Sequence, residues 1–544
     1  MSESSMVRRA VAGAVMVAAL GLGAVTAVQP AHAASGPVAA GTAGMSPSPA
    51  PLPTLLPNGN APQSATLYSS ACSSASFCVA VGTVEDAELD SYPLVETYDG
   101  STWSASTAPL PANADAGPSN GAVLYSVSCG SDGTCGAAGD YNDFDGTVQY
   151  QNGLLEALSG GTWTATEATL ASGPDSGLVN LRGVSCPDAT TCVAIGDVYV
   201  FGSKTVPSTW STLIYLLASG TWQLQTAIPV PSSYQNSLEL SSVSCADESD
   251  CVVVGSYEDA SSSQGLILTL TSGSWSAEEA SLPSNANTEP NARGMKVLDS
   301  VDCVDAADCV AGGAYVDSSG NIDPLLEILQ SGTWTPQEGP VPPDSQSNTL
   351  AAITGVSCPA VGTCLADGYY WTDYQAGDES GMVLTQSGPN WSAASAPLPV
   401  TASAKESGNQ TSTTIAGLDG ISCSTTGTCM AVGGFGPSAS DQQGLIVSLP
   451  AGRPIPLAIT SAGQATFTDH RKSSFTVTAT GYPTPLITEK GKLPKGLHFK
   501  KGKGSATISG TPAVKKPGSY PVTITASNGP TSSVDQTVSV VVGS

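Results

Sequence analysis

Short apolar runs, rather than long amphipathic stretches, dominate this sequence. Residues 181–231 show the unit clearly: "LRGVSC" and "TCVAIGDVY" are followed by "STLIYLLASG" and "TWQLQTAIPVP", with Gly, Ser, Pro and Asp between the runs. Runs of this length that are rich in Val, Ile and Thr and bounded by turn residues are typical of β-strands. Helical periodicity is absent from these repeats. The pattern therefore predicts a unit of four strands, which we call a to d.

The same unit recurs along the chain. All 14 cysteines fall into seven pairs with five residues between the partners, and a glycine stands four positions after each second cysteine. Successive first cysteines lie 55 to 65 residues apart, a period that indicates a repeat architecture. Four-stranded units repeated seven times resemble the blades of a seven-bladed β-propeller. The pairs are Cys72/Cys78, Cys129/Cys135, Cys186/Cys192, Cys245/Cys251, Cys303/Cys309, Cys358/Cys364 and Cys423/Cys429.

The N-terminus has the features of a signal peptide. A basic segment with Arg8 and Arg9 precedes an apolar run and an Ala-His-Ala cleavage site that ends at Ala33, so residues 1–33 are expected to be removed on export. An exported chain with an even number of cysteines favours disulfides. Zinc would need further ligands, and residues 34–450 contain no histidine. We therefore expect one local disulfide per blade in a protein that is secreted, extracellular or non-covalently associated with the cell surface.

The last repeat lacks the fourth strand of the others. Six repeats carry a tryptophan at the start of this strand, and we expect these tryptophans to pack within the blades: Trp103, Trp163, Trp222, Trp275, Trp334 and Trp391. Residues 44–53, "GMSPSPAPLP", align without gaps to "TWSASTAPLP" of the first complete repeat. We expect this segment to be the closing strand of the last blade, which would leave no long exposed sheet edge.

The composition changes after the seventh repeat. The string "LPKGLHF…ATISGTP…GSYPVTITASNG" resembles the immunoglobulin-like domains of bacterial surface proteins, and the resemblance implies a β-sandwich. The predicted fold is therefore all-β: a seven-bladed β-propeller at 44–450 and an Ig-like β-sandwich at 457–544. Residues 34–43 and 451–456 are expected to be linkers.

Charge divides the two predicted domains. Residues 34–450 carry five basic and 41 acidic residues, a net charge of −36, whereas residues 451–544 carry eleven basic and three acidic ones, a net charge of +8. Nucleic acid is excluded as a partner of the propeller because its phosphates would be repelled. The basic stretch "EKGKLPKGLHFKKGKG" (489–504) suits anionic cell-wall polymers, and equally a solvated loop that aids solubility.

Sequence variation among the repeats is concentrated in the b–c loops. The a–b and c–d turns are nearly uniform and lie on the opposite face of a propeller, so the b–c face is the expected binding face. Its loops are rich in aromatic and acidic residues, which suit a neutral ligand with many hydroxyl groups. The recurrent Tyr141, Tyr257, Tyr315, Tyr370 and Phe435 are expected to pack within the blades. The ligand-binding candidates are Trp210, Trp371, Tyr374, Tyr150, Phe144 and Asp373.

Catalytic signals are weak. No histidine is available to a catalytic triad in the propeller, and a sialidase would need a cluster of arginines where this region has Arg182 and Arg293. Two carboxylates suffice for glycoside hydrolysis, but 41 acidic residues make that signal unspecific. In "DYNDFDG", Tyr141 stands where a calcium loop needs its first ligand. We expect no cofactor, no metal and no catalytic residue that the sequence alone can name.

The sequence thus predicts a secreted, non-catalytic protein that binds glycans or another cell-surface or cell-wall ligand, with no membrane insertion after cleavage of the signal peptide. One alternative is a polysaccharide-cleaving hydrolase or lyase that uses paired carboxylates at the mouth of the propeller. The other is a structural or protein-binding surface module. A buried carboxylate pair at the mouth would favour the enzyme, and aromatic shelves without such a pair would favour the binding protein.

Overall fold

The computed structural model describes residues 45–543 with internal gaps. The gaps are 115–120, 145–148, 171–176, 189, 201–208, 219–220, 226–227, 261, 288–296, 331, 347–349, 374–377, 400–414, 425–427, 437–441, 450–457, 460, 481–485, 504 and 528–532. The predicted signal peptide and both predicted linkers lie outside the described residues.

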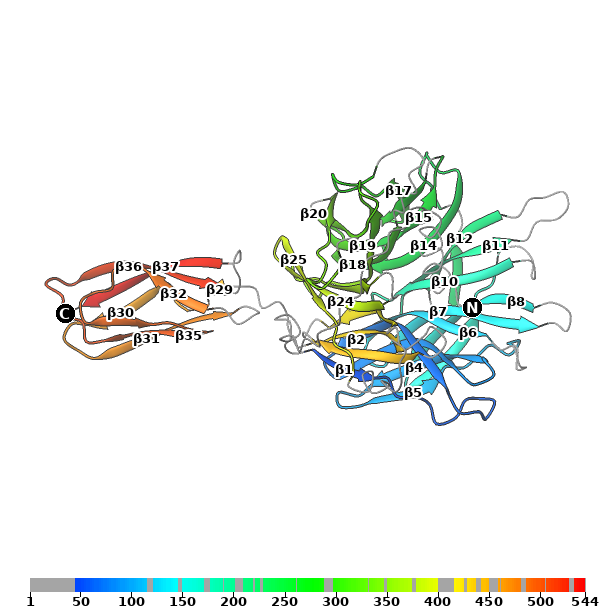
Figure 1. The fold of residues 1–544 in the computed structure, drawn as a ribbon, viewed down its shortest axis with the longest axis horizontal. Coiled ribbons are helices and arrows are strands. Elements are labelled where there is room, and N and C mark those ends of the chain that lie inside the picture. The colour runs from blue at the N-terminus through cyan, green and yellow to red at the C-terminus, as the bar shows by residue number, and fades with distance from the viewer. Residues whose placement is uncertain are drawn as a thin grey trace, which may run out of the picture.

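The described strands of the N-terminal region form seven antiparallel blades in a ring (Figure 1). Blade 1 holds β2 (Ser64–Ser74), β3 (Phe77–Glu85), β4 (Ser91–Tyr98) and β5 (Trp103–Thr107). Blade 2 holds β6 (Ala122–Ser131), β7 (Thr134–Phe144), β8 (Gln149–Ser159) and β9 (Thr162–Glu167). Blade 3 holds β10 (Gly177–Ser185), β11 (Cys192–Val200), β12 (Thr209–Ala218) and β13 (Thr221–Gln225). Blade 4 holds β14 (Asn236–Cys245), β15 (Asp250–Glu258), β16 (Ser263–Thr271) and β17 (Ser274–Glu279).

The remaining blades continue the pattern. Blade 5 holds β18 (Val297–Asp305), β19 (Asp308–Val316), β20 (Ile322–Gln330) and β21 (Thr333–Glu338). Blade 6 holds β22 (Ala351–Ser357), β23 (Leu365–Asp373), β24 (Asp378–Ser387) and β25 (Asn390–Ser395). Blade 7 holds β26 (Ile415–Cys423), β27 (Cys429–Gly436), β28 (Gln443–Leu449) and, from the start of the described chain, β1 (Ser46–Pro49).

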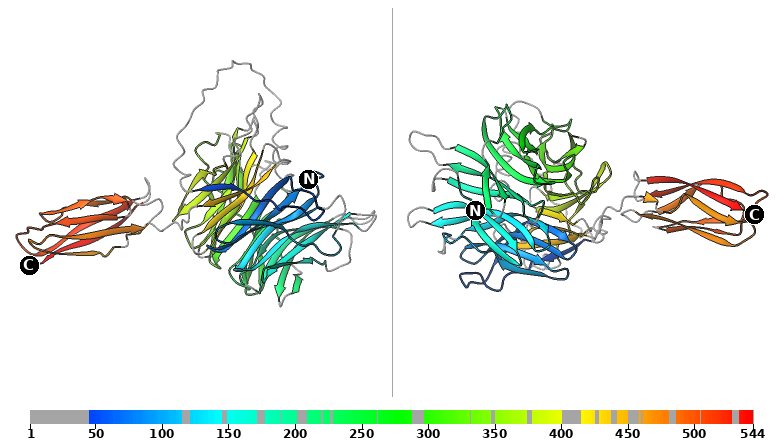
Figure 2. Two further views of the ribbon diagram at one scale, coloured as in Figure 1. Left: turned by 90° about the horizontal axis from the view of Figure 1, so that it is seen from below. Right: turned by 180° about the vertical axis from the view of Figure 1, so that it is seen from behind.

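Strand β1 pairs with the last propeller strand. Ser46 lies opposite Ser448 and Pro49 opposite Leu445 in an antiparallel ladder, and in Figure 2 the dark blue first strand lies beside the gold strands of blade 7. The ladder continues through the N–H of Ala50, which donates to the carbonyl of Gly444 at 2.8 Å. Blade 7 is therefore built from both ends of the propeller sequence.

Burial follows the position of a strand in its blade. The second strands are buried on both faces because each blade packs between two neighbours, as the unbroken buried run within β3 shows. The fourth strands alternate between exposed and half-buried positions, and all six repeat tryptophans lie at half-buried ones, packed against the cores as expected. The recurrent aromatic residues are buried as well: Tyr141, Tyr257, Tyr315, Tyr370 and Phe435.

The seven predicted disulfides are present, one in each blade. Each joins the end of the first strand to the start of the second, across a Cα–Cα distance of 4.0 to 4.1 Å. Because each disulfide closes a loop of only a few residues, each is expected to contribute about 2 kcal/mol through the entropy of the unfolded chain. The cysteine pairs therefore stabilise the scaffold and are not a metal site.

The second cysteine of each pair is part of the hydrophobic core. It stands at the start of the second strand, which packs between two neighbouring blades, so its sulfur is shielded from solvent. Their predicted role as disulfide partners is confirmed, and burial is consistent with a structural role. They are Cys78, Cys135, Cys192, Cys251, Cys309, Cys364 and Cys429.

The C-terminal strands form two sheets of a sandwich, orange to red in Figure 1. One sheet has β29 (Ala458–Ile459), β31 (Ser473–Thr480), β35 (Ser505–Gly510) and β33 (Leu497–Lys500). The other has β30 (Gln464–Thr468), β37 (Ser533–Gly543), β36 (Gly518–Ser527), β32 (Leu486–Lys490) and β34 (Gly502–Lys503). Alternate residues of facing strands, among them Val477, Ile524 and Val540, fill the core between the sheets. All described strands together confirm the all-β prediction.

Candidate functional site

Each innermost strand carries a β-bulge opposite the repeat glycine. In blade 1, Leu67 pairs with Gly82 and Ser69 pairs with the residue before that glycine, so Tyr68 between them bulges out. A Cβ on Gly82 would lie 1.9 Å from the carbonyl oxygen of Thr66, which only glycine allows. The other six repeat glycines show the same approach, at 1.9 to 2.1 Å. The glycine therefore fixes a bulge that redirects one side chain per blade.

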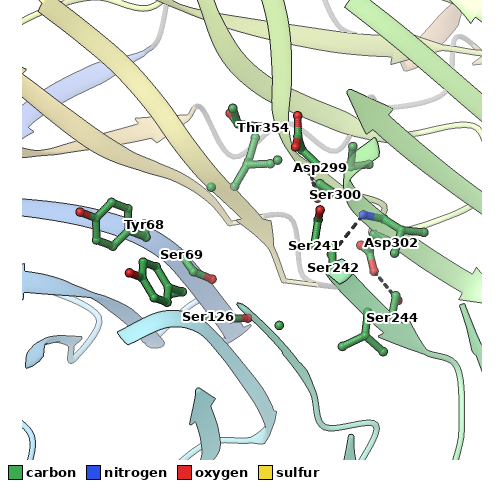
Figure 3. Close-up of a pocket in the computed structure, with 18 of the residues that line it drawn as sticks. Tyr68, Ser69, Ser126, Ser241, Ser242, Ser244, Asp299, Ser300, Asp302 and Thr354 are labelled. Carbon is green, nitrogen blue, oxygen red and sulfur yellow. Dashed lines mark hydrogen bonds between the residues drawn. The ribbon is translucent and has the colours of Figure 1, made fainter. Parts of the chain in front are cut away.

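The bulged residues form a ring at the centre of the propeller. They all stand four positions before the first cysteine of their repeat, and they all line one cavity of about 650 Å³, bounded by the first strand of every blade (Figure 3). We call them the channel ring: Tyr68, Tyr125, Arg182, Ser241, Asp299, Thr354 and Asp419. The residue before each is Leu or Ile and the residue after is Ser or Gly, so the blades differ at the bulged position while its two neighbours hardly change.

Hydroxyl groups beside the ring tie neighbouring inner strands together. Ser69 accepts the backbone N–H of Val127 at 3.3 Å, and Ser128 accepts that of Cys186 at 2.9 Å. Equivalent bonds to the first cysteine of the following repeat come from Ser185, Ser244, Ser357 and Ser422. Because these bonds span adjacent blades, the channel wall is held in place by the scaffold.

One side of the channel is aromatic. The rings of Tyr68 and Tyr125, on adjacent blades, have centroids 5.6 Å apart and planes inclined by 46°. Both residues are half-buried, so part of each ring faces the cavity. In Figure 3, Tyr68 lies across the pocket from Asp299 and Asp302 of blade 5. The channel thus has an aromatic side and an acidic side.

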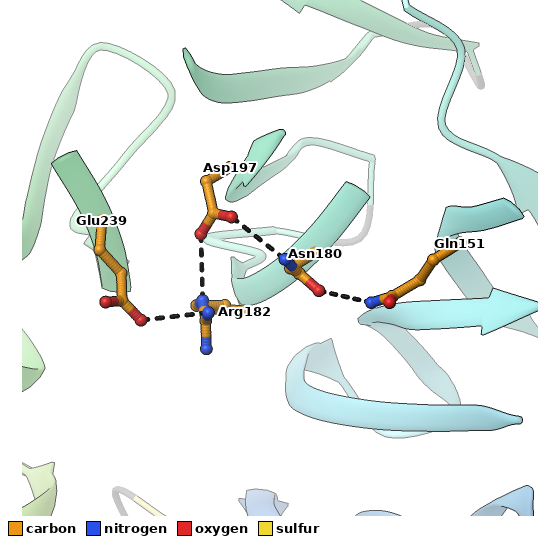
Figure 4. Close-up of polar contacts among 5 residues, drawn as sticks. All are labelled: Gln151, Asn180, Arg182, Asp197 and Glu239. Carbon is orange, nitrogen blue, oxygen red and sulfur yellow. Dashed lines mark hydrogen bonds and ion pairs between the residues drawn. The ribbon is translucent and has the colours of Figure 1, made fainter. Parts of the chain in front are cut away.

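Arg182 is the one cation among the described residues of the propeller, and it lies in this channel. Its Nε donates to Asp197 at 3.1 Å and its Nη2 to Glu239 at 3.1 Å, so it is held between two carboxylates (Figure 4). Asn180 donates to the other oxygen of Asp197 at 3.2 Å and itself accepts from Gln151. This network runs through blades 2, 3 and 4 and orients the guanidinium.

The acidic side carries two carboxyl groups with raised pKa values. Burial raises the pKa of Asp299 to about 7. The repulsion of Glu239 adds to this rise, and the attraction of Arg182 opposes it. Burial likewise raises the pKa of Asp302 to about 6, although Asp302 accepts the N–H of Cys358 at 2.6 Å. Asp419 of blade 7 also lines the channel. The acidic side of the channel therefore carries more negative charge than the described positive charge of the propeller, Arg182, can balance.

A further carboxylate lies directly behind the wall. Asp367 of β23 is fully buried, and neither of its carboxylate oxygens has a hydrogen-bond partner among the described residues. Its Oδ1 lies 2.3 Å from where a Cβ of Gly355 would be, and Gly355 lines the channel beside Gly420. Burial and the nearby Asp419 raise the pKa of Asp367 well above its usual range.

The binding candidates from the sequence lie on three different blades. Tyr150 is in β8, Trp210 in β12 and Trp371 in β23. Phe144 and Asp373 are strand residues whose side chains are outside the described part, and Tyr374 lies outside it altogether. The sequence predicts loops at these positions, but the second and third strands continue into them, as the pairing of Phe144 with Gln149 shows.

Trp210 and Trp371 differ in exposure and in their neighbours. Trp210 is 39 % exposed, and its ring lies 4.9 Å from that of Tyr199 on the neighbouring strand. Trp371 is half-buried and lies two positions from Tyr369, which lines the channel. Because alternate residues share a face of a strand, Trp371 is on the same face of β23 as Tyr369.

Sequence reasoning missed the channel ring. Its signal is present: in "LYSVSC", "LRGVSC" and "LDSVDC" the second residue varies while its neighbours hardly change. Variation is attributed to loops above because loops usually carry function. A varying residue inside a strand instead indicates a side chain that the common blade packing does not use.

The arrangement suits recognition of a hydroxyl-rich ligand. Tyrosine rings present flat apolar faces that pack on the C–H groups of a sugar. Carboxylates accept hydrogen bonds from hydroxyl groups, and Arg182 donates them. Among the described residues, no cluster of His, Cys, Asp and Glu is arranged to hold a metal ion.

Comparisons with known proteins bear on the sandwich and on the general fold. Residues 448–543 match the family described as "Putative Ig domain". No curated protein matches the sequence. Among the described residues, no helix has the length and apolar character needed to cross a membrane.

Several solved structures resemble the chain loosely. A protein of unknown function from Dyadobacter fermentans is 11% identical with a TM-score of 0.37, over 60% of this chain and 93% of that one. An α-L-arabinofuranosidase of Fusarium graminearum, solved with arabinobiose, is 11% identical with a TM-score of 0.34, over 62% and 95%. The WD40 domain of SCAP from fission yeast is 8% identical with a TM-score of 0.32, over 88% and 97%. At these scores we draw no functional argument from the likeness.

Proposed function

We propose that this is a secreted, non-catalytic carbohydrate-binding protein that takes part of a glycan into the central channel. The observation that supports it most is the tyrosine pair, Tyr68 and Tyr125, facing an acidic side across one cavity. Nothing in the common blade structure requires tyrosine at these positions, because other blades have Arg, Ser, Thr or Asp there. The channel ring would supply the contacts, and the scaffold would keep them preorganised.

The tyrosine pair provides the first test. In a glycan-array screen, the mature protein should bind a defined set of glycans, and Tyr68→Ala with Tyr125→Ala should lower the affinity for them. The expected loss is roughly 10- to 100-fold, since each aromatic contact contributes about 0.5–1.5 kcal/mol. The matched control is Tyr68→Phe with Tyr125→Phe, which keeps the rings and should keep most of the affinity. Full binding by the double alanine variant would place the ligand elsewhere.

The aromatic and acidic residues of the b–c face extend this proposal beyond the channel. We expect them to contact the parts of the glycan that leave the channel at that face: Trp371, Trp210, Tyr150, Phe144, Asp373 and Tyr374. Trp371 is the strongest of them because it follows the channel-lining Tyr369 on the same face of β23.

Trp371→Ala should therefore weaken glycan binding by about 0.5–1.5 kcal/mol, the size of an aromatic contact. Trp391 of the same blade is the control because it packs against the core. Trp391→Ala should lower the free energy of unfolding by about 3 kcal/mol and leave the affinity unchanged. Calorimetric titration and thermal melting of both variants give the two readouts. The opposite assignment, with Trp371→Ala losing stability but not affinity, would make Trp371 a packing residue.

A polysaccharide-cleaving hydrolase is the second candidate, favoured by one observation. Asp299, with a pKa of about 7, can hold a proton near neutral pH, while Glu239 is paired with the cation Arg182. Two carboxyl groups in such different environments are the arrangement that acid–base catalysis of glycoside cleavage uses. Release of reducing ends from a bound glycan, abolished by Asp299→Asn, would establish this candidate in place of simple binding.

The sandwich contributes a separate basic surface. Arg471, Lys472, Lys495, Lys515 and Lys516 are exposed in three loops at one end of it. Backbone hydrogen bonds join these loops, one from His470 to Pro512 and one from Ala513 to Lys495. Contact of this end with anionic cell-wall polymers stays a prediction, as does association with the cell surface.

A further inference from the structure

The charge of the channel narrows the class of glycan. We infer that the channel selects a cationic saccharide, one built from hexosamine units with free amino groups, over neutral or acidic glycans. This inference rests on the proposed carbohydrate-binding function and adds the chemical group that is recognised. It is carried by the charges that line the cavity and by the tyrosine pair opposite them.

The channel has an excess of carboxylates with little positive charge to balance them. Glu239, Asp299, Asp302 and Asp419 line it, and the described propeller residues offer Arg182 alone as a counter-charge. Arg182 is already held at 3.1 Å by Asp197 and at 3.1 Å by Glu239. Asp299 is attracted by Arg182 at longer range, but neither Asp299 nor Asp302 forms an ion pair of its own among the described residues.

The fully buried Asp367 gives an independent observation for a cation at this place. Its carboxylate has no hydrogen-bond partner in the described part of the chain, and it lies against Gly355 of the channel wall. A buried carboxyl group without a partner is costly when it is charged. A cation in the channel near Gly355 and Asp419 would stabilise the ionised form of Asp367, against the burial and the nearby Asp419 that disfavour it.

The aromatic side favours the same ligand. An ammonium group near the face of a tyrosine ring is attracted by its π-electrons, and the sugar ring that carries the group packs on the same face. A uronic acid would instead bring a further negative charge among the four lining carboxyl groups. The electrostatic field of the whole propeller also favours a cationic ligand, because residues 34–450 contain 41 acidic and five basic residues.

Binding of such a ligand should also release protons. Burial keeps part of the Asp299 population protonated near pH 7, and a nearby ammonium group favours the ionised carboxylate. The heat of binding measured at pH 6.5 in two buffers of different ionisation enthalpy reports this release directly. A neutral saccharide in the same channel would not produce it.

The decisive comparison uses two tetrasaccharides with one skeleton. A glucosamine tetramer with free amino groups should bind at least about tenfold more tightly than its N-acetylated form, with protons released. Asp299→Asn with Asp419→Asn should abolish this preference, whereas Tyr68→Ala with Tyr125→Ala should weaken both ligands. Glu248→Gln, at an exposed turn, is the control for a lost carboxylate. It should change neither the affinity for the two tetrasaccharides nor the preference between them.

The outcomes separate the two proposals. Equal binding of both tetramers, or preference for the acetylated one, would overturn the amino-sugar inference and leave carbohydrate binding intact. Binding of tetralysine with no binding of either saccharide would overturn both proposals and identify a cationic peptide as the ligand. Because the Asn variants keep side-chain shape and remove repulsion, their melting temperatures should be at least those of the unmodified protein, which excludes misfolding as the cause of a lost preference.

Discussion

Removal of residues 45–56 should lower the melting temperature of the propeller by about 10 °C, because it opens the ring. The deletion takes away β1 and its ladder to β28. It also removes Ala50 and Leu56, which are buried in the core between blades 7 and 1. Burial of one leucine side chain contributes about 1.5–3 kcal/mol, and the lost ladder and the exposed edge add to that.

The deletion should also change the association state. Strand β28 would become an edge with unpaired backbone groups, and exposed edges pair with other chains. Size-exclusion chromatography should therefore show dimers or larger species. The control is a chain that starts at Met45, which keeps β1 and should melt like a chain that starts at Ala34. Equal melting temperatures for the control and the deletion would show that β1 contributes nothing to closure.

The blade architecture can be predicted from the sequence because the residues that determine it lie close together along the chain. Each disulfide joins strands separated by one turn, and each repeat tryptophan follows a turn of fixed composition, so a short window contains the whole signal. The pairing of residues 46–49 with 445–448 is not local, yet it is predictable, since the last repeat lacks a strand that the start of the chain can supply. Repetition thus makes a long-range contact visible.

The candidate site is less predictable because it depends on how the blades meet. Tyr68 and Tyr125 are close because each inner strand bulges and because the ring of blades is curved. Neither feature can be inferred from the sequence of a single repeat. The clash that fixes the bulge, between a Cβ on Gly82 and the carbonyl of Thr66, needs coordinates to be seen. The sequence shows that this glycine recurs but not that it aims a neighbouring side chain into the channel.

Three buried glutamates also escape sequence reasoning, although each stands out as a lone charge in an apolar strand. They are Glu96 in "PLVETY", Glu156 in "LLEAL" and Glu327 in "LLEIL". All three are fully buried and pair across the blade with an alanine two positions after the second cysteine. At the same position of blade 3, Tyr215 donates its hydroxyl to the carbonyl of Thr169 at 3.1 Å. A protonated glutamate can donate in the same way.

Burial makes these glutamates neutral in the folded protein. It raises the pKa of Glu96, Glu156 and Glu327 to about 8, and for Glu327 it outweighs the backbone N–H of Ser281. In the unfolded chain the same groups lose their protons near a pKa of 4.5. The folded state therefore binds more protons, and its stability falls as the pH rises from about 4.5 to about 8.

Glu96→Gln with Glu156→Gln should therefore stabilise the protein at pH 8 and not at pH 5. Each shifted carboxyl group lowers the free energy of unfolding by an amount of the order of 3 kcal/mol at pH 7. The amide needs hydrogen-bond partners of its own, so we expect a net gain of about 1–2 kcal/mol for each substitution at pH 8. At pH 5 the glutamates are protonated in the fold, and each costs less than about 1 kcal/mol because the unfolded chain, with a pKa of 4.5, still binds part of these protons. The hydrogen-bond needs of the amide offset so small a term, and the gain should largely vanish.

The measurement is the melting temperature at unit steps from pH 5 to pH 9. Glu248→Gln at an exposed turn is the matched control, and its curve should follow that of the unmodified protein. Asp299 and Asp302, whose pKa values are also raised, add to the fall in stability with pH in all these variants, so the difference between curves isolates the glutamates. If the double glutamine variant lost stability equally at every pH, Glu96 and Glu156 would be charged and partnered in the fold. That result would require donors between the blades that the described residues do not provide.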